Sequence, residues 1–423
     1  MSHTILTFIS KVKPAEFARL SNLLEQIRQN PEKNVYVPFR SLNLLHFASF
    51  TLHQSLKTPE YGPYLVFENN FDGELSGYLE DLYAHAASGL HQIYSSCLDY
   101  TVKNASDRQG IIDYLTAHVV RPNAYHIGNT GRSVARIQQE QVLRDALEAH
   151  GDTLVERGKT SSPDSVLTAF QQFVRSDQNW SWIPDFGPRQ TFAEQFANWS
   201  KLILVAGLAM LFSPIWILPV IIGLLVLRYK ESIDSVQNGQ ADPANVANLL
   251  RNENHTQSVQ NHMASITIVK PGWLRRAALW TVLYAVNLLA RARATHGELS
   301  GIPSIHFAHW SMIDNGRRLL FLSNFDGSWE NYLDDFIDKA SVGLTGVWSN
   351  TVNFPRTYFL VFGGATDGPR FKAVARDSQT VTNAWYSAYR DLTVQGIDNS
   401  SALREDLLKP LDATAAPALL RRL

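Results

Sequence analysis

The chain has almost no cysteine and no excess charge of either sign. Cys97 is the single cysteine among 423 residues, so the sequence excludes an intrachain disulfide and a cysteine-rich metal site. The chain has 38 lysine and arginine residues and 39 aspartate and glutamate residues. It therefore has no excess of positive charge that would attract nucleic acid. The first residues also lack the basic segment and long apolar run of a secretory signal. We therefore expect no nucleic-acid partner, and folded domains in the cytoplasm.

Common catalytic signatures are missing as well. The sequence contains no P-loop, no dinucleotide-binding glycine fingerprint, no H-E-x-x-H and no G-x-S-x-G. Residues 128–132 (GNTGR) could hold an anion through backbone N–H groups, and they fit a strand-to-helix turn equally well. Any chemistry has to come from residues outside the common motifs.

What the chain does contain is a repeat of itself. Residues 70–95 and 324–349 align without a gap and share eleven residues, beginning with the tetrapeptide Asn-Phe-Asp-Gly. A shorter echo lies upstream of each copy, where residues 45–48 (LHFA) match residues 305–308 (IHFA). Two similar segments 254 positions apart predict two similar domains that pack together as an internal pseudo-dimer.

A long apolar segment separates the two copies. Residues 202–227 contain no charged residue, and they lie between Lys201 and Arg228 with Trp199 and Tyr229 close by. The length exceeds the roughly 18–20 apolar residues that a bilayer-spanning helix needs. Aromatic and cationic flanks are typical of the membrane interface. The segment therefore predicts attachment to a membrane.

Two prolines, Pro214 and Pro219, divide this segment and leave two arrangements open. One kinked helix could cross the bilayer and place the two domains on opposite sides. Alternatively, residues 202–212 and 215–227 could form a hairpin that enters the bilayer and returns. Domains that pack together must lie on the same side, so we favour the hairpin.

A second apolar stretch, residues 277–290, lies between arginines at 275, 276, 291 and 293. It is too short to cross a bilayer but could lie in the interface as a helix. Burial against the first copy is the alternative.

Both copies have the same expected order of elements, β-α-β-β-α-β, which is the ferredoxin-like order. A further helix is expected after each copy, at residues 134–149 and 378–392. In the first copy, we expect strands at residues 4–10, 42–53, 64–68 and 124–127 and helices at 14–29 and 74–95. In the second copy, we expect strands at residues 264–269, 304–313, 318–323 and 357–362 and helices at 273–294 and 328–350. We predict an α+β fold: two tandem ferredoxin-like (βαββαβ) domains, residues 1–155 and 261–423, that form an intrachain pseudo-dimeric α/β barrel. Residues 156–260 connect them and carry the membrane hairpin or helix.

This order and duplication resemble the dimeric α/β-barrel superfamily of ferredoxin-like proteins, which includes small monooxygenases, chlorite dismutases and dye-decolorising peroxidases. The resemblance implies that the open faces of the two sheets meet and enclose a pocket. Residues 364–368 (GATDG) are similar to the G-x-x-D-G pattern of dye-decolorising peroxidases, which implies a role for Asp367 on the distal side of haem. Those enzymes take their proximal histidine from farther along the chain, and no histidine follows His309 here. Haem would therefore need an earlier ligand such as His306 or His126.

The repeated motifs supply four candidate site residues. Asp72 and Asp326 end a strand and begin a helix, so we expect them to cap that helix, with an acid–base or ligand role as the alternative. His46 and His306 are each the single imidazole on an otherwise apolar strand face. Each is either a hydrogen-bonded core histidine or a residue that points into the barrel as a haem ligand, base or donor.

The resulting functional prediction is a membrane-associated oxidoreductase of the haem-peroxidase or monooxygenase kind. Its small apolar or lipid-like substrate would bind in the barrel pocket, with His306 or His46 as ligand or base and with Asp326 and Asp367 as polar partners. Membrane lipid would be its other partner. The alternative is a non-catalytic, membrane-associated lipid-binding or scaffold protein.

Overall fold

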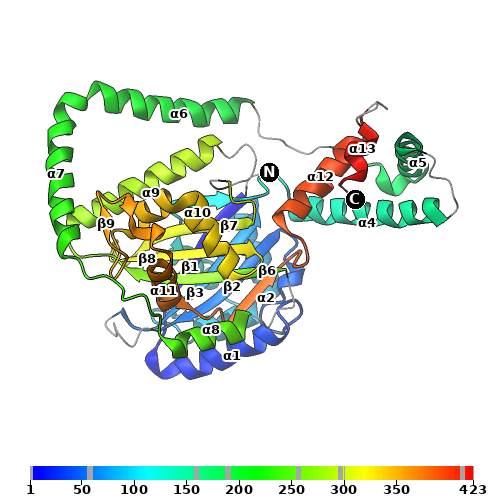
Figure 1. The fold of residues 1–423 in the computed structure, drawn as a ribbon. Coiled ribbons are helices and arrows are strands. Elements are labelled where there is room, and N and C mark those ends of the chain that lie inside the picture. Colours follow the sequence, from blue (N-terminus) through cyan, green and yellow to red (C-terminus); the bar gives the residue numbers. More distant parts are fainter. Residues whose placement is uncertain are drawn as a thin grey trace.

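The computed structural model describes residues 3–54, 61–156, 162–185, 192–253, 259–293, 299, 301–409 and 415–422, and the structural statements that follow concern these residues. They form a mixed α+β fold with two antiparallel five-stranded sheets. The two sheets pack against each other, an apolar helical arm lies on one side of them, and a helical lobe lies on the other (Figure 1).

The two sheets have the same order of corresponding strands. From one edge to the other, the first sheet consists of β12 (Ala384–Ser387), β2 (Leu45–His53), β3 (Tyr64–Asp72), β1 (His3–Lys11) and β4 (Val119–Val120). The second sheet consists of β5 (Ala124–Ile127), β7 (Ile305–Ile313), β8 (Arg318–Asp326), β6 (Gln260–Ile268) and β11 (Gln379–Thr380). Each sheet thus takes four strands from one half of the chain and one edge strand from the other half.

This exchange of edge strands is held by an asparagine on each side. Asn123, just before β5, donates its backbone N–H to the Trp310 carbonyl oxygen at 2.8 Å. Its side-chain oxygen accepts the N–H of Met312 at 2.7 Å. Asn383, just before β12, makes the same two bonds to Phe50 and Leu52 of β2. The two halves are therefore interlocked by hydrogen bonds rather than joined only by a linker.

Helices cover the outer face of each sheet. The first sheet is covered by α1 (Phe17–Gln29), α2 (Leu75–Tyr94) and α3 (Arg108–Ala117), and the second by α9 (Trp273–Arg293), α10 (Trp329–Trp348) and α11 (Gly368–Ser378). Stacked aromatic side chains form the centre of each core: Phe50 and Phe67 have ring centroids 4.1 Å apart, and Trp310 and Phe321 in the second half 4.9 Å. Between the sheets lies a smaller apolar cluster that includes Val66 and Leu322.

The helices that follow each half form the lobe. They are α4 (Val134–Glu156), α5 (Pro163–Ser176), α12 (Val394–Leu407) and α13 (Ala415–Leu420), and leucines such as Leu143 and Leu403 bury one another between them. In Figure 1 this lobe extends to the right of the sheets.

The apolar arm consists of α6 (Phe192–Leu211) and α7 (Ser213–Ile233). α7 is long and apolar enough to cross a membrane, and only 6% of its most apolar window is buried. The chain breaks at Phe212, and Pro214 occupies the first turn of α7, where a missing N–H costs no helical bond. Figure 1 shows α6 running across the top of the view and α7 down its left side, an elbow rather than the expected hairpin or a single span. The Trp216 indole donates to the Ala209 carbonyl oxygen across this elbow at 2.7 Å.

The second apolar stretch is one face of α9. Leu279 and Leu283 are buried against the second half, whereas Trp273 and Trp280 are 73% and 53% exposed. Burial against the first copy is thus wrong for Leu279 and Leu283, which pack in the core of the second half. The interfacial position of the helix stays a prediction.

Two expected elements are wrong, and a third lies in the other sheet. Residues 357–362 are not the last strand of the second half; they contain β9 (Thr357–Tyr358) and β10 (Phe362–Gly363), which pair only with each other. Residues 378–392 are not a helix but contain β11 and β12. Residues 124–127 do form a strand, but in the other sheet. The physical reason is that two-residue strands and a crossing between sheets leave no periodicity in the sequence.

Candidate functional site

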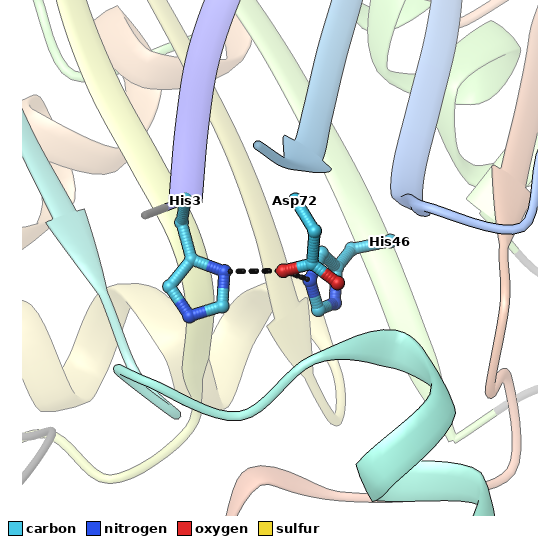
Figure 2. A group of neighbouring side chains, drawn as sticks. All are labelled: His3, His46 and Asp72. Carbon is cyan, nitrogen blue, oxygen red and sulfur yellow. Dashed lines mark hydrogen bonds and ion pairs between the residues drawn. The ribbon is translucent and has the colours of Figure 1, made fainter. Parts of the chain in front are cut away.

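The first candidate site joins the ends of β1, β2 and β3. Figure 2 shows His3 and His46 on either side of the Asp72 carboxylate. The His46 Nε2 lies 3.0 Å from Asp72 Oδ1, and the His46 Nδ1 bonds to the Tyr389 hydroxyl at 2.8 Å. The other carboxylate oxygen accepts the Val134 N–H at 3.0 Å, where α4 begins. Asp72 therefore ties two strands to the start of a helix.

His3 completes this cluster, and its bonds define its tautomer. Its Nδ1 lies 3.0 Å from Asp72 Oδ1, and its Nε2 accepts the Gly131 N–H at 2.9 Å. A ring nitrogen that accepts carries no proton, so in the neutral ring the proton is on Nδ1 and faces the carboxylate. By the same logic, Tyr389 donates to His46 Nδ1, and His46 Nε2–H faces Asp72.

Burial and these bonds determine the charges in the cluster. Burial would raise the pKa of Asp72, but the hydrogen bonds from His3, His46 and the Val134 N–H hold it well below its usual range. Burial lowers the pKa of His46, although Asp72 favours the charged form. At neutral pH Asp72 is thus a carboxylate that faces a neutral His46 ring.

Two histidines and one carboxylate are also a donor set that metal ions use. The residues as arranged do not fit a metal ion, because a ligating His3 Nδ1 would need its proton on Nε2, where the Gly131 N–H already donates. The arrangement therefore fits a cluster held by ion-pair and hydrogen-bond contacts better than a metal site.

The second half repeats this unit with one change. His306 Nε2 lies 2.8 Å from Asp326 Oδ1, and Asp326 Oδ2 accepts the Val394 N–H at 2.8 Å, where α12 begins. The place of His3 opposite the aspartate is taken by Gln260. Both aspartates therefore bond to the start of the helix after their half, which corrects the expectation that they cap the helix next in sequence. That next helix begins at Glu74 in the first half, without a side-chain cap, and at Ser328 in the second.

The other predicted site residues lie elsewhere. Asp367 caps α11 through the Arg370 N–H and pairs with the Arg370 side chain at 2.5 Å on the surface, so it takes no part in either His–Asp pair. The equivalent cap of α3 is Asp107. His126 is buried on β5 opposite Ala308. Thus the structure joins His46 to Asp72 and His306 to Asp326, and it places Asp367 at the start of α11, away from both pairs.

A different buried carboxylate, which sequence reasoning missed, lies between the two sheets. Glu68 on β3 is fully buried, and its Oε2 is 2.8 Å from His262 Nε2 on β6 of the opposite sheet. Ser49 donates to the same oxygen at 3.0 Å. Asn70 and Asn324 donate to Oε1 at 3.0 and 3.1 Å. Each carboxylate oxygen thus has two donors.

These partners keep Glu68 ionised in the interior. Burial alone would raise its pKa, but the charge and hydrogen bond of His262, the charge of His309 and the Asn70 bond lower it to about 2. For His309, burial is the largest cause and lowers the pKa to about 4. The carboxylate is therefore charged and His309 is neutral at pH 7.

The same centre reaches the surface at a cleft. The cleft has a volume of about 500 Å³ and lies between α1, α8 (Pro243–Glu253), β6 and residues 379–390, so both halves form it. His262 lies in its wall, and the His262 Nδ1 bonds to the Thr382 hydroxyl at 2.7 Å. Thr382 is partly exposed, whereas the His262 side chain is 3% exposed. Most of the residues that line it have polar side chains.

Glu68, His262 and Thr382 give no signal that sequence alone could join. Glu68 precedes the repeated motif and is replaced by Leu322 at the corresponding place in β8, so the repeat does not mark it. The segment that carries Thr382 was assigned to a helix.

Comparison with known proteins identifies no relative. No family model, no curated protein and no solved structure matches this chain.

Proposed function

We propose that this is a membrane-attached binding protein, in which α6 and α7 lie in lipid and the two interlocked halves carry the ligand cleft outside the bilayer. The halves are proposed to be tandem ferredoxin-like domains that form an intrachain α/β barrel. The observation that carries the proposal is the exposure of the arm: along most of α7, aliphatic side chains such as Ile215 (72%) and Leu218 (62%) are exposed. A soluble protein does not leave an apolar helix of this length uncovered.

Neighbouring elements extend the same apolar surface. α7 contacts α9, whose exposed face carries Trp273 and Trp280, and it contacts β9. The turn between β9 and β10 presents Phe359 at 46% and Phe362 at 62% exposure. Aromatic side chains beside an apolar helix are typical of a membrane interface.

A buried glutamate at the end of α7 fixes that aromatic turn. Phe359 and Leu360 both have positive φ angles, 53° and 67°, which non-glycine residues rarely adopt. The Glu231 carboxylate accepts the N–H groups of both residues at 2.9 and 2.8 Å and the Thr357 hydroxyl at 2.6 Å. A carboxylate on α7 therefore holds the turn in place, which links the arm to the exposed aromatics.

The haem oxidoreductase prediction has less support than membrane attachment. Both histidines proposed as ligand or base, His46 and His306, bond through Nε2 to an aspartate. The sheet interface holds the Glu68 network and an apolar cluster. The cleft is lined by side chains such as Arg28 and Arg390, which suit a polar ligand or headgroup better than an apolar substrate.

Membrane fractionation tests the attachment. The full chain should sediment with membranes and require detergent for release. Replacing Leu218 and Ile222 together by arginine should move it to the soluble fraction, because each change costs about 3 kcal/mol in lipid. The matched control replaces Val142 and Val155, which are similarly exposed on α4, by arginine as well. This variant should stay in the membrane fraction. A wild-type chain that stays soluble without detergent would contradict the proposal.

A further inference from the structure

The wall of the cleft contains three side chains joined in series. The Thr382 hydroxyl lies 2.7 Å from His262 Nδ1, and His262 Nε2 lies 2.8 Å from Glu68 Oε2. A carboxylate can only accept, so Nε2 carries the proton that faces Glu68. In the neutral ring Nδ1 then holds a lone pair, and the threonine O–H donates to it. The hydroxyl proton therefore has a base in contact with it.

The carboxylate behind the imidazole is fixed and dry. Glu68 is fully buried, and Ser49, Asn70 and Asn324 donate to it from both sheets. It therefore cannot turn away from His262 without leaving these donors unsatisfied. Such a carboxylate orients the imidazole and stabilises the positive charge that the ring gains when it takes a proton.

The outer end of the series is accessible. Thr382 is partly exposed on the segment that crosses from β11 to β12, and that segment lines the 500 Å³ cleft. Arg28, Arg390 and Trp385 lie along the same cleft, where Arg28 is paired with Glu25. A substrate carbonyl can thus approach the hydroxyl while Glu68 stays inaccessible to water.

We propose that Thr382, His262 and Glu68 form a nucleophile–base–carboxylate triad that hydrolyses a carboxylic ester bound in the cleft. Thr382 Oγ1 attacks the carbonyl carbon, and its proton passes to His262 Nδ1. The ester C–O bond then breaks, and the leaving alcohol takes the proton from His262. Water attacks the acyl-threonine with His262 as base, which releases the acid and restores the hydroxyl. Thr382 and His262 are the catalytic residues, and Glu68 is a positioning residue.

The ring is turned relative to the usual serine-hydrolase arrangement, since Nδ1 faces the hydroxyl and Nε2 the carboxylate. Each nitrogen nevertheless has the role that the reaction requires. The activity does not depend on membrane attachment, so it can be tested separately from the proposed function.

The chain supplies a matched control in the same region. Thr380 also lines the cleft, and its hydroxyl lies 2.8 Å from His53 Nδ1. Among the described contacts of His53, no carboxylate faces it, and burial, the largest cause, lowers its pKa to about 4 with Arg318 acting in the same direction. Thr380–His53 is therefore a threonine–histidine pair without the third member.

The experiment measures hydrolysis of p-nitrophenyl esters, from acetyl to octanoyl, by the detergent-solubilised full chain. Thr382→Ala and His262→Ala should each lower the rate about 10²-fold or more, and Thr382→Ser should keep activity. Thr380→Ala should lower the rate far less than Thr382→Ala, because it alters the cleft lining but leaves the three joined side chains in place. Glu68→Gln should lower kcat with little change in KM. Mass spectrometry of the quenched reaction should find the acyl group on Thr382.

Two results would overturn the triad. One is a folded Thr382→Ala protein that is as active as wild type or Thr382→Ser on every ester. The other is an equal loss in Thr380→Ala, which would assign the effect to the segment and not to the hydroxyl. Either result leaves the membrane proposal unchanged.

Discussion

Two kinds of buried carboxylate site occur in this molecule, and they differ in whether the second half repeats them. The His46–Asp72 pair recurs as His306–Asp326, with a bond from the aspartate to the first N–H of α4 or α12 in both cases. The Glu68 centre occurs once. At the corresponding places the other half has Leu322 for Glu68, Ile5 for His262 and Pro122 for Thr382.

The difference separates architecture from chemistry. A pair that both halves keep, with the same helix bonded to it, serves the fold that both halves share. At the places that correspond to the polar centre, the same fold also occurs with leucine, isoleucine and proline. The fold therefore does not require the polar centre. Because well-packed apolar residues are often at least as stable as a buried charged network in the same place, the presence of this centre in one half needs a reason other than stability. The cleft beside His262 supplies that reason.

The largest expected effect on stability comes from giving Glu68 the residue that the second half has at the corresponding place, which is leucine. Glu68→Leu should lower the free energy of unfolding by about 3–5 kcal/mol, because His262, Asn70 and Asn324 lose their acceptor inside the protein. Urea unfolding in detergent measures the change.

The double variant Glu68→Leu with His262→Ile sharpens the comparison. It copies two residues of the apolar version, so it should recover part of the lost stability while abolishing ester hydrolysis. A double variant as unstable as the sum of the two single variants would contradict the view that the apolar set suits this fold.

A smaller effect, dependent on pH, is expected from His309, which corresponds to Ser49 in the first half. Its folded pKa of about 4 lies below the usual value of 6.5. Above pH 6.5 the ring is neutral in both states. As the pH falls from 6.5 to 4, the unfolded chain binds a proton that the folded chain refuses, so stability falls by about 3 kcal/mol.

His309→Ser should remove that part of the acid sensitivity. The groups that face the ring are Glu68, His262 and the Thr7 hydroxyl, and all three remain in the variant. Unfolding midpoints measured from pH 8 to pH 4 should diverge between wild type and variant below about pH 6.5. His85→Ser, on an exposed part of α2, is the control and should run parallel to wild type. Parallel curves for His309→Ser would show that burial does not hold this ring neutral.

The parts of the fold that could be predicted from the sequence are those with a regular spacing of apolar residues or with a repeated motif. The mixed α+β class, the strands β1, β2 and β3 and the break of the apolar segment before Pro214 follow from local patterns and are confirmed. The expected break at Pro219 is wrong, because this proline lies inside α7. The repeated His and Asp residues were found because the motif marks them. Their joint position was not predicted, because it depends on the start of β2 lying beside the end of β3.

The exchange of edge strands and the Glu68 centre depend on contacts between distant segments. Glu68 and His262 are 194 positions apart, and Glu68 and Thr382 farther still. One signal was available: Asn123-Ala124 before Tyr125 matches Asn383-Ala384 before Trp385. Aligning this second echo would have placed β12 as a strand and kept Thr382 out of a helix.

The smallest expected difference lies within the repeated pair itself. Asp72 has two imidazoles and a helix N–H around it, and its side chain is 1% exposed. Asp326 has one imidazole and a helix N–H, and its side chain is 11% exposed. In addition, the Tyr389 hydroxyl bonds to His46 Nδ1, whereas His306 Nδ1 is buried without a hydrogen-bond partner among the described residues.

Asp72→Asn should therefore destabilise the protein more than Asp326→Asn, by about 3 against about 1.5 kcal/mol, because an amide cannot accept from every donor that the carboxylate satisfies. Urea unfolding of both variants in detergent measures the difference, and His3→Gln, which gives the first half the glutamine of the second, should reduce it. Equal costs would mean that the helix N–H bond, common to both sites, accounts for most of the stabilisation and that His3 adds little. In either case the ester hydrolysis proposed for Thr382 should survive, since neither aspartate lies in the cleft lining.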